Sequence, residues 1–240
     1  MTPLDMVIPS VSSVMQPKGT HIMPGYLLKF KEKYSVKIGG RKYPVVKIGN
    51  QLWMAENLDY KFDVNGSKIP IGGSGSPTTP AAWYYNNNET DYGIDGTYKC
   101  GLLYNWYAVK YLDDNRSTLL PDGWRAASDN DWINLTTNYG GSGSNSPLKA
   151  SNNSVVQGFP SNWGGSGELG FNILPTGCHP LDGPNAGRFI DFNGMVYYWT
   201  TYDGGTYCHA RWMTSSSVTG VENYSHKKNA FYIRLVKSLE

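Results

Sequence analysis

Apolar stretches separated by glycine turns open the part of the chain that has a clear pattern. Residues 34–58, YSVKIGGRKYPVVKIGNQLWMAENL, are interrupted by Gly39-Gly40 and by Gly49-Asn50. Two-residue turns between antiparallel strands need positive φ, which glycine and asparagine adopt most readily. The pattern therefore predicts successive strands of a meander.

Two later segments have helical patterns. In residues 101–112, GLLYNWYAVKYL, the apolar residues recur at helical spacing and predict a short amphipathic helix. Ser128 followed by Asp131 resembles a capping box, in which each residue caps a backbone N–H near the start of a helix. This arrangement predicts a second helix over about residues 129–138, ended by the glycines after Tyr139.

The last third of the chain has a strand pattern, with Gly/Ser/Asn-rich stretches before it. Alternation of Phe231, Ile233 and Leu235 predicts a terminal core strand with one face directed inward. The fold class is therefore predicted to be α+β, with two helices, an antiparallel sheet and long loops. The short runs that predict strands are FNILPTG (171–177), GRFIDFNG (187–194), MVYYWTTY (195–202), HARWMTSS (209–216), VTGVEN (218–223) and NAFYIRLVK (229–237).

Composition limits the domain number and the class of partner. The chain has 240 residues, 40% of them hydrophobic, which suits one domain over residues 36–238 preceded by an arm or attachment segment over residues 1–35. The net charge is +2 with scattered basic residues, so no nucleic-acid partner is expected. No apolar run approaches the roughly 18 residues of a membrane span, and no signal peptide is recognisable at the N-terminus.

The sequence contains no recognised pattern of catalytic residues. The three cysteines lack the spacing of a zinc site, and both one disulfide with a free thiol and three buried thiols remain open. No histidine lies in HExxH and no serine in GxSxG. Cys208 and His209 are adjacent and would point to opposite faces of a strand, so they do not form a catalytic dyad. We therefore expect no enzymatic activity.

Calcium is the one metal for which the sequence offers a candidate loop. Glu89, Asp91 and Asp95 lie close together in NNNETDYGIDG, and calcium needs several clustered oxygen ligands. The triplets that hold calcium in sugar-binding C-type lectins are absent, and solvated loop residues explain the cluster better. No cofactor is therefore expected, and calcium-dependent sugar binding is not supported.

The segment between Tyr197 and Asn229 is the strongest candidate for a binding surface. Trp199, Ala210, Trp212 and Val221 are interpreted as core anchors. The residues between them mix Tyr, Ser, His and Arg, a composition similar to that of antibody binding loops. The positions predicted to be displayed for ligand binding are Tyr202, Asp203, Tyr207, His209, Arg211, Met213, Ser215, Tyr224, Ser225 and His226.

Six ordered blocks resemble a known family, the Fibrobacter succinogenes major paralogous domain, which is common in Bacteroidetes surface proteins. The resemblance covers about residues 36–237 and implies a C-type-lectin-like fold with a display or binding role. The blocks are KIGNQLWMAENLDY (47–60), GLLYNWYAV (101–109), LPDGWRAASDNDW (120–132), GFNILPTG (170–177), YYWTTY (197–202) and FYIRLVK (231–237). The tryptophans expected to be largely buried are Trp53, Trp106, Trp124, Trp132 and Trp199.

One departure from the family changes the expected setting. Where the family often has two cysteines that look like disulfide partners, this chain has Leu120 and Leu235. A protein made in a reducing compartment gains nothing from such a bridge. This favours a phage structural protein, located on a virion or on a bacterial cell surface.

The combined prediction is a receptor-binding or adhesion protein that recognises a cell-surface protein or glycan. Variable proteins of diversity-generating retroelements use a C-type-lectin-like fold with variation near the C-terminus, and the residue types at 202–229 are compatible with that class. The arm is the predicted means of homo-oligomerisation. Two alternatives stay open: a relative of the formylglycine-generating enzymes, which use paired cysteines and copper, and a structural cell-envelope protein.

Overall fold

The computed structural model describes residues 34–72, 78–89, 93–94, 98–151 and 162–239. Its first three strands form the predicted meander: β1 (Tyr34–Ile38), β2 (Arg41–Ile48) and β3 (Gln51–Met54) pair antiparallel. The turn between the first two consists of Gly39 and Gly40, with φ of 57° and 88°. Glycine adopts such angles without steric cost, which is why the local sequence was sufficient to predict this turn.

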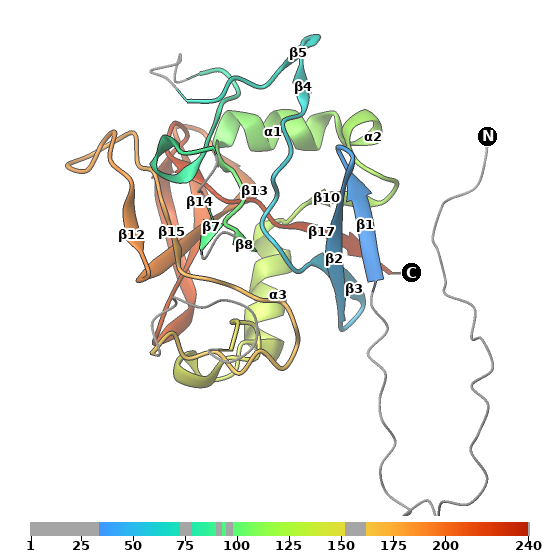
Figure 1. The fold of residues 1–240 in the computed structure, drawn as a ribbon, viewed down its shortest axis with the longest axis vertical. Coiled ribbons are helices and arrows are strands. Elements are labelled where there is room, and N and C mark those ends of the chain that lie inside the picture. Colours follow the sequence, from blue (N-terminus) through green and yellow to red (C-terminus); the bar gives the residue numbers. More distant parts are fainter. Residues whose placement is uncertain (1–33, 73–77, 90–92, 95–97, 152–161, 240) are drawn as a thin grey trace, which may run out of the picture. The chain divides into compact units, whose positions relative to one another are not determined.

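The end of the chain returns to this meander and completes its sheet. Strand β17 (Leu235–Ser238) pairs with β3 on one side and with β10 (Trp124–Ala126) on the other. The sheet order is β1-β2-β3-β17-β10. The first and last strands of the fold therefore lie close together, with most of the chain looping out between them (Figure 1).

A second five-stranded sheet contains the candidate binding segment. Its order is β12-β11-β13-β14-β15, antiparallel except between β11 and β13. The bounds are Thr176–Cys178 for β11, Ile190–Phe192 for β12, Met195–Gly204 for β13, Tyr207–Thr214 for β14 and Ser217–His226 for β15. The smaller strands are β4 (Asp63–Val64), β5 (Ser67–Lys68), β6 (Ala82–Trp83), β7 (Gly93–Ile94), β8 (Tyr98–Lys99), β9 (Leu103–Asn105) and β16 (Ala230–Phe231).

The first predicted helix is shorter and later than expected. Residues 103–105 form β9, and helix α1 covers Trp106–Asp114, with the Asn105 side chain accepting a hydrogen bond from the Ala108 N–H. A helical turn, α2 (Arg116–Leu119), follows. The prediction over 101–112 was wrong at its start because Leu103–Asn105 pair with β6 and β16, and this pairing outweighs local helical spacing.

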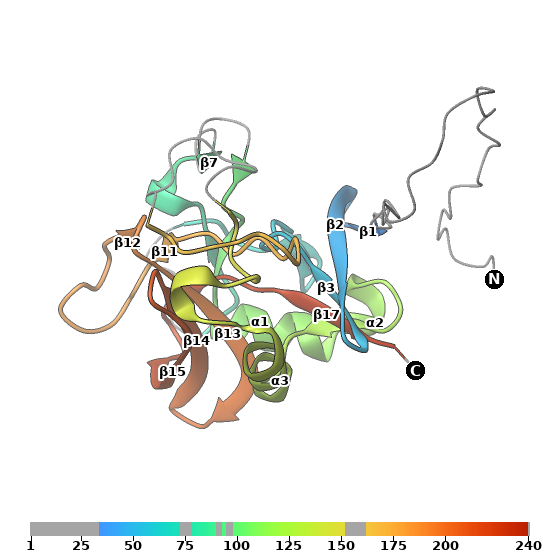
Figure 2. The same cartoon turned by 90° about the horizontal axis from the view of Figure 1, so that it is seen from below.

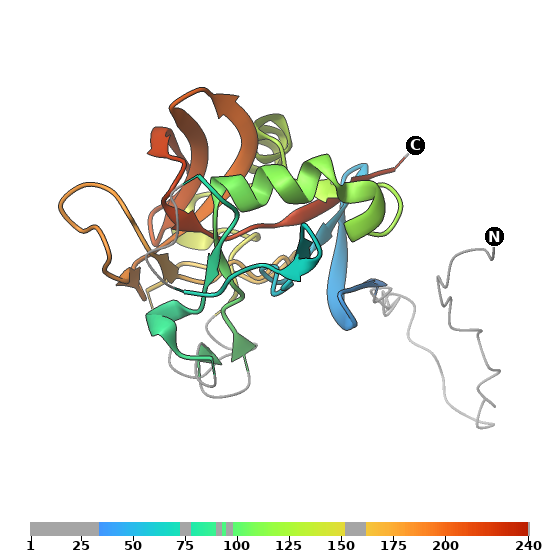
Figure 3. The ribbon, with the colours of Figure 1, turned by 90° about the horizontal axis from the view of Figure 1, so that it is seen from above.

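The second predicted helix is confirmed. Helix α3 covers Asp129–Tyr139, and the capping box between Ser128 and Asp131 is present in both directions. Helices α1 and α3 both pack against β13 (Figures 2 and 3). The structure also contains two short 3-10 turns, η1 (Tyr85–Asn87) and η2 (Gly143–Asn145).

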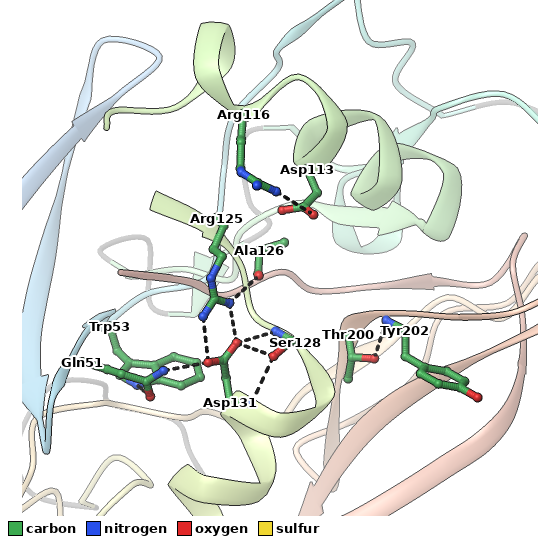
Figure 4. Close-up of polar contacts among 10 residues, drawn as sticks. All are labelled: Gln51, Trp53, Asp113, Arg116, Arg125, Ala126, Ser128, Asp131, Thr200 and Tyr202. Carbon is green, nitrogen blue, oxygen red and sulfur yellow. Dashed lines mark hydrogen bonds and ion pairs between the residues drawn. The ribbon is translucent and has the colours of Figure 1, made fainter. Parts of the chain in front are cut away.

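Asp131 also binds side chains outside its helix, as Figure 4 shows. Its two carboxylate oxygens accept hydrogen bonds from Arg125, and one of them also accepts from Gln51 at 2.6 Å. Burial alone would raise the pKa of Asp131, but the hydrogen bonds from Arg125 and Ser128 outweigh burial and lower it. One carboxylate therefore joins β3, β10 and the start of α3.

The predicted tryptophan core is confirmed. Trp53 contacts Trp132 and Phe171, with ring centroids 5.3 and 5.5 Å away, and Trp132 lies 4.8 Å from Tyr198 of β13. Burying an aromatic side chain of this size contributes roughly 2–3 kcal/mol. The exposed fractions of the five predicted tryptophans are 0% for Trp53, 2% for Trp106, 6% for Trp124, 0% for Trp132 and 1% for Trp199.

The terminal strand departs from its prediction. The segment breaks into β16 and β17, and every residue from Phe231 to Val236 is buried, so no face of this segment is directed to solvent. Leu120 and Leu235, which stand where the family often has cysteines, both lie in the hydrophobic core.

Arg234 lies at the centre of this segment and is 1% exposed. Its Nε donates to the Asn57 side chain at 2.8 Å, and its guanidinium donates to the carbonyls of Met54, Phe171 and Asn172. Within the described part of the chain these partners include no carboxylate. The charge is therefore balanced by oriented dipoles from two separate segments, residues 54–57 and 171–172.

The predicted arm, residues 1–35, falls almost entirely outside the described residues, so the domain division stays a prediction. Among the described helices none is long and apolar enough to cross a membrane.

Replacing Arg234 by Met should lower the free energy of unfolding by about 3–5 kcal/mol, because its buried carbonyl partners lose their donors. Urea unfolding followed by tryptophan fluorescence measures this change. Arg116→Met is the control, since Arg116 forms an exposed pair with Asp113 and its loss should cost under about 0.5 kcal/mol. Equal stability of the Arg234 and Arg116 variants would show that the buried contacts contribute nothing.

His179 should make the stability pH-dependent. It is 4% exposed, stacks on Phe189 at 4.0 Å and hydrogen-bonds through Nδ1 to the Arg188 carbonyl. Burial lowers its pKa, so the unfolded chain binds a proton that the folded chain does not, and stability falls as pH drops below the ordinary histidine value of about 6.5. In urea titrations between about pH 7 and 5, His179→Asn should lose less stability than the unsubstituted chain.

Candidate functional site

The candidate binding segment forms the three long strands β13, β14 and β15, and their register decides which side chains share a face. Tyr207 pairs with Gly204 on one side and with His226 on the other. Directly paired residues point to the same side of a sheet, as do residues two apart on one strand. Tyr207, His209 and His226 therefore lie on one face.

Tyr202 joins these residues by packing. Its ring stacks on the His209 ring, with centroids 3.9 Å apart, and the ring of Tyr207 lies edge-on to His226 at 5.8 Å. A register shift between Trp199 and Asp203 lets β13 place Tyr202 over its neighbour. Val221 is on the same face, because it pairs with Arg211, which lies two residues after His209.

These five residues, Tyr202, Tyr207, His209, Val221 and His226, are called the tyrosine–histidine face. Tyr202 is 48% exposed, Tyr207 42% and Val221 38%, and all three are among the most exposed large apolar side chains of the described chain. The two histidines are half-buried beneath the tyrosines. The face therefore presents aromatic and aliphatic side chains to solvent, with the two imidazole rings packed beneath them.

A partly buried ion pair supports the face from below. Arg211 is 6% exposed and donates through Nε to Asp129 Oδ1 at 3.0 Å, and its Nη2 forms an ion pair with the same oxygen at 2.6 Å. Asp129 Oδ2 lies 3.4 Å from His209 Nδ1, an ion-pair distance whose geometry does not make a hydrogen bond. Tyr202 thus stacks on His209, His209 lies next to Asp129, and Asp129 pairs with Arg211.

Four of the ten predicted display residues therefore come together: Tyr202, Tyr207, His209 and His226. Tyr224 is in β15, and its side chain lies outside the described residues. The others are buried, point elsewhere or lie at the far end of the sheet.

Three predicted display residues are buried, and their prediction as exposed positions was wrong. Arg211 is 6% exposed, Met213 0% and Ser225 4%. Met213 pairs with the fully buried Val196, and Ser225 with the fully buried Cys208. Simple alternation failed because the β14–β15 register shifts twice and both faces of the sheet's middle are covered.

The predicted anchors are confirmed at two positions only. Trp199 and Ala210 are buried, at 1% and 0% exposed. Trp212 is half-buried and lies flat on Gly220, where a Cβ atom would meet its ring at 2.1 Å. Val221, predicted as an anchor, is exposed instead and belongs to the tyrosine–histidine face.

Asp203 and Ser215 lie away from this face. Asp203 forms an ion pair of 2.7 Å with Lys227, whose ammonium stands 4.4 Å from the Trp106 ring centre. Burial alone would raise the pKa of Asp203, but the contact with Lys227 outweighs burial and lowers it. Ser215 lies in the turn between β14 and β15, at the opposite end of the sheet from Tyr207.

The cysteines lack the features of a reactive thiol. Cys100, Cys178 and Cys208 are all buried, and no disulfide joins them within the described chain, which agrees with the second of the two alternatives left open by the sequence. Burial raises the pKa of Cys208 to about 11 and also raises that of Cys178. Catalytic thiols have lowered pKa values, so these side chains behave as small hydrophobic residues.

The calcium prediction falls partly outside the described residues. Asp91 and Asp95 are not described, and Glu89 accepts hydrogen bonds from Lys61 and Tyr84, both at 2.7 Å. In the described part of the chain no group of three or more His, Cys, Asp or Glu side chains could hold a metal ion.

Two charged residues that hold this sheet in place were missed from the sequence. Asp129 is 82 positions from its partner Arg211 in the sequence. Its place in the first turn of α3 accounts for an acidic residue by helix stability alone and does not indicate a partner on the sheet. Lys149, which binds the Ser215 carbonyl, stands in an unpatterned loop. Neither carries a local signal that links it to the sheet.

Comparison with known proteins gives a family match. A family model described as Fibrobacter succinogenes major domain matches residues 46–237. No curated protein and no solved structure matches the chain.

Replacing Arg211 by Met should lower the free energy of unfolding by about 2–3 kcal/mol, since Asp129 loses a charged donor in a partly buried site. Lys110→Met is the control, because the pair of Lys110 with Asp114 is exposed and contributes under about 0.5 kcal/mol. Chemical denaturation of both variants measures the difference. If the Arg211 variant loses no more stability than the Lys110 variant, the ion pair does not support the face.

Proposed function

This chain belongs to the Fibrobacter succinogenes major domain family, and we propose that it is a non-enzymatic protein that binds a cell-surface protein or glycan through its tyrosine–histidine face. The observation that carries the proposal is the gathering of Tyr202 and Tyr207, 48% and 42% exposed, on one side of one sheet. Tyrosine offers a large, rigid contact area and a polar hydroxyl, which suits both protein and sugar ligands.

Preorganisation supports the same conclusion. A side chain that is ordered only on binding costs about 0.5–1.5 kcal/mol of affinity. The Tyr202 ring is already stacked on His209, which is itself positioned by Asp129 and Arg211. Much of that ordering cost is therefore met when the protein folds.

We assign the fold to the C-type-lectin-like class as part of the same proposal. The pairing of β3 with β17 supports it, because the chain loops out and returns to the sheet where it began. The two main helices and the long connections before β13 support it as well.

The proposed setting is a virion or bacterial surface, where the domain is displayed on its N-terminal arm. Residues 1–35 would mediate attachment or homo-oligomerisation, since weak single sites gain affinity from multivalency. Calcium and other cofactors have no place in the proposal.

If the gene is diversified by a retroelement, the structure limits where variation can occur. Tyr202, Tyr207, His209 and His226 could change without opening a cavity in the core. Met213 and Arg211 could not, because the first fills the core and the second holds Asp129. A template repeat that varies the codons of the face and spares those two would support this form of the proposal.

The two other function classes have less support. An enzyme of the formylglycine-generating type would need reactive cysteines, whereas burial raises the thiol pKa of Cys178 and Cys208. A structural envelope protein would need no exposed face supported by a partly buried ion pair.

Substituting Tyr202 or Tyr207 by Ala should weaken binding at least tenfold, because central aromatic contacts contribute about 2 kcal/mol or more to an interface. The probes are a printed glycan array and labelled intact bacterial cells. Tyr34→Ala is the matched control, since Tyr34 is 36% exposed on β1 of the other sheet. Full binding by the double variant Tyr202→Ala/Tyr207→Ala would exclude this face as the binding site.

A further inference from the structure

Lys149 is fully buried, and its ammonium contacts only backbone oxygens among its described hydrogen bonds. Its Nζ donates to the carbonyls of Gly143, Trp163, Thr214 and Ser215, at 2.5, 3.2, 2.5 and 3.0 Å. The Trp163 ring centre lies 4.7 Å from the same nitrogen. The four oxygens come from three loops, those around 143, 163 and 214–215.

The number and type of these oxygens are those of a cation site. An ammonium has three N–H donors, so four acceptors exceed what hydrogen bonding to lysine requires. Converging backbone carbonyls replace the hydration shell of monovalent cations elsewhere in proteins. The oxygens and the aromatic face together favour a positive charge at this point.

Backbone packing holds the oxygens in place independently of the side chain. A Cβ on Gly143 would meet the Ser216 carbonyl oxygen at 1.8 Å, and one on Gly164 would meet the Ser215 carbonyl oxygen at 2.8 Å. The loops approach so closely that only glycine fits at both positions. The ring of carbonyls is therefore built by the fold as well as by the lysine.

The charged state of Lys149 agrees with this geometry. Burial lowers its pKa to about 8, which is still above neutral pH, so the ammonium form predominates there. The positive charge of the Lys149 ammonium excludes a second cation from this position.

We propose that the carbonyl oxygens of Gly143, Trp163, Thr214 and Ser215 form a cation-binding site whose occupant is the chain's own Lys149 ammonium. Once that side chain is removed, the site takes up a small ammonium ion from solution. The Lys149 ammonium thereby orders the turn between β14 and β15. Because it is covalently part of the chain, it cannot dissociate as a bound metal ion can. This inference does not rest on the proposed function.

Chemical rescue of Lys149→Ala tests the site. This substitution removes three carbons and the nitrogen, so n-propylammonium replaces the lost atoms. The variant should melt about 5–10 °C below the unsubstituted chain. Millimolar n-propylammonium chloride should raise its melting temperature saturably, whereas tetramethylammonium chloride, which has the same charge and no N–H donor, should not. Neither salt should shift the unsubstituted chain or the surface control Lys110→Ala.

A second variant keeps the proposal testable if Lys149→Ala does not fold. Lys149→Met keeps most of the stem and ends one atom short, which leaves a gap the size of an ammonium ion. Ammonium chloride should then raise the melting temperature more than tetramethylammonium chloride does. The proposal is overturned if the rescuing ion stabilises its variant no better than tetramethylammonium, or if Lys149→Met is as stable as the unsubstituted chain and does not respond to ammonium.

Discussion

The buried guanidinium of Arg234 is the contact on which the arrangement of the domain depends. It joins the end of the first meander, through Met54 and Asn57, to the loop at Phe171–Asn172 and to the final strand. A buried charge is costly unless every donor is satisfied. The two partner segments and the segment that carries Arg234 must therefore be in place together. This requirement couples the closing of the first sheet to the positioning of the loop that precedes the second sheet.

Lys149 repeats this principle beside the same loop, because its backbone pairs with Ile173, the neighbour of Asn172. Both cations are buried, and both donate to backbone carbonyls of residues far away in the sequence. A chain with 28 glycines and only 17% charged residues has many such carbonyls and few charges with which to organise them. Each of these buried cations satisfies several carbonyls at once and so holds together the segments that carry them.

The features predictable from the sequence are those fixed by a few neighbouring residues. The turn at Gly39-Gly40 and the capping box of Ser128 and Asp131 depend on local backbone preference, and both were predicted correctly. Arg211 and Val221 were assigned to the wrong environments, because their exposure depends on strand register and on the position of α3. A prediction from alternating polar and apolar residues assumes that one face of the sheet is exposed to solvent. In the middle of this sheet neither face is exposed.

The same constraint locates the tyrosine–histidine face. Where β13 and β14 lie between the core and α3, side chains on both faces are packed, and a change there alters the fold. At the end of the sheet beyond the first turn of α3, Tyr202 and Tyr207 remain exposed. Asp129 lies at this boundary, in the first turn of α3 and paired with Arg211. The division between the core and the tyrosine–histidine face therefore runs through a single carboxylate, which ties the shape of the face to the stability of the domain.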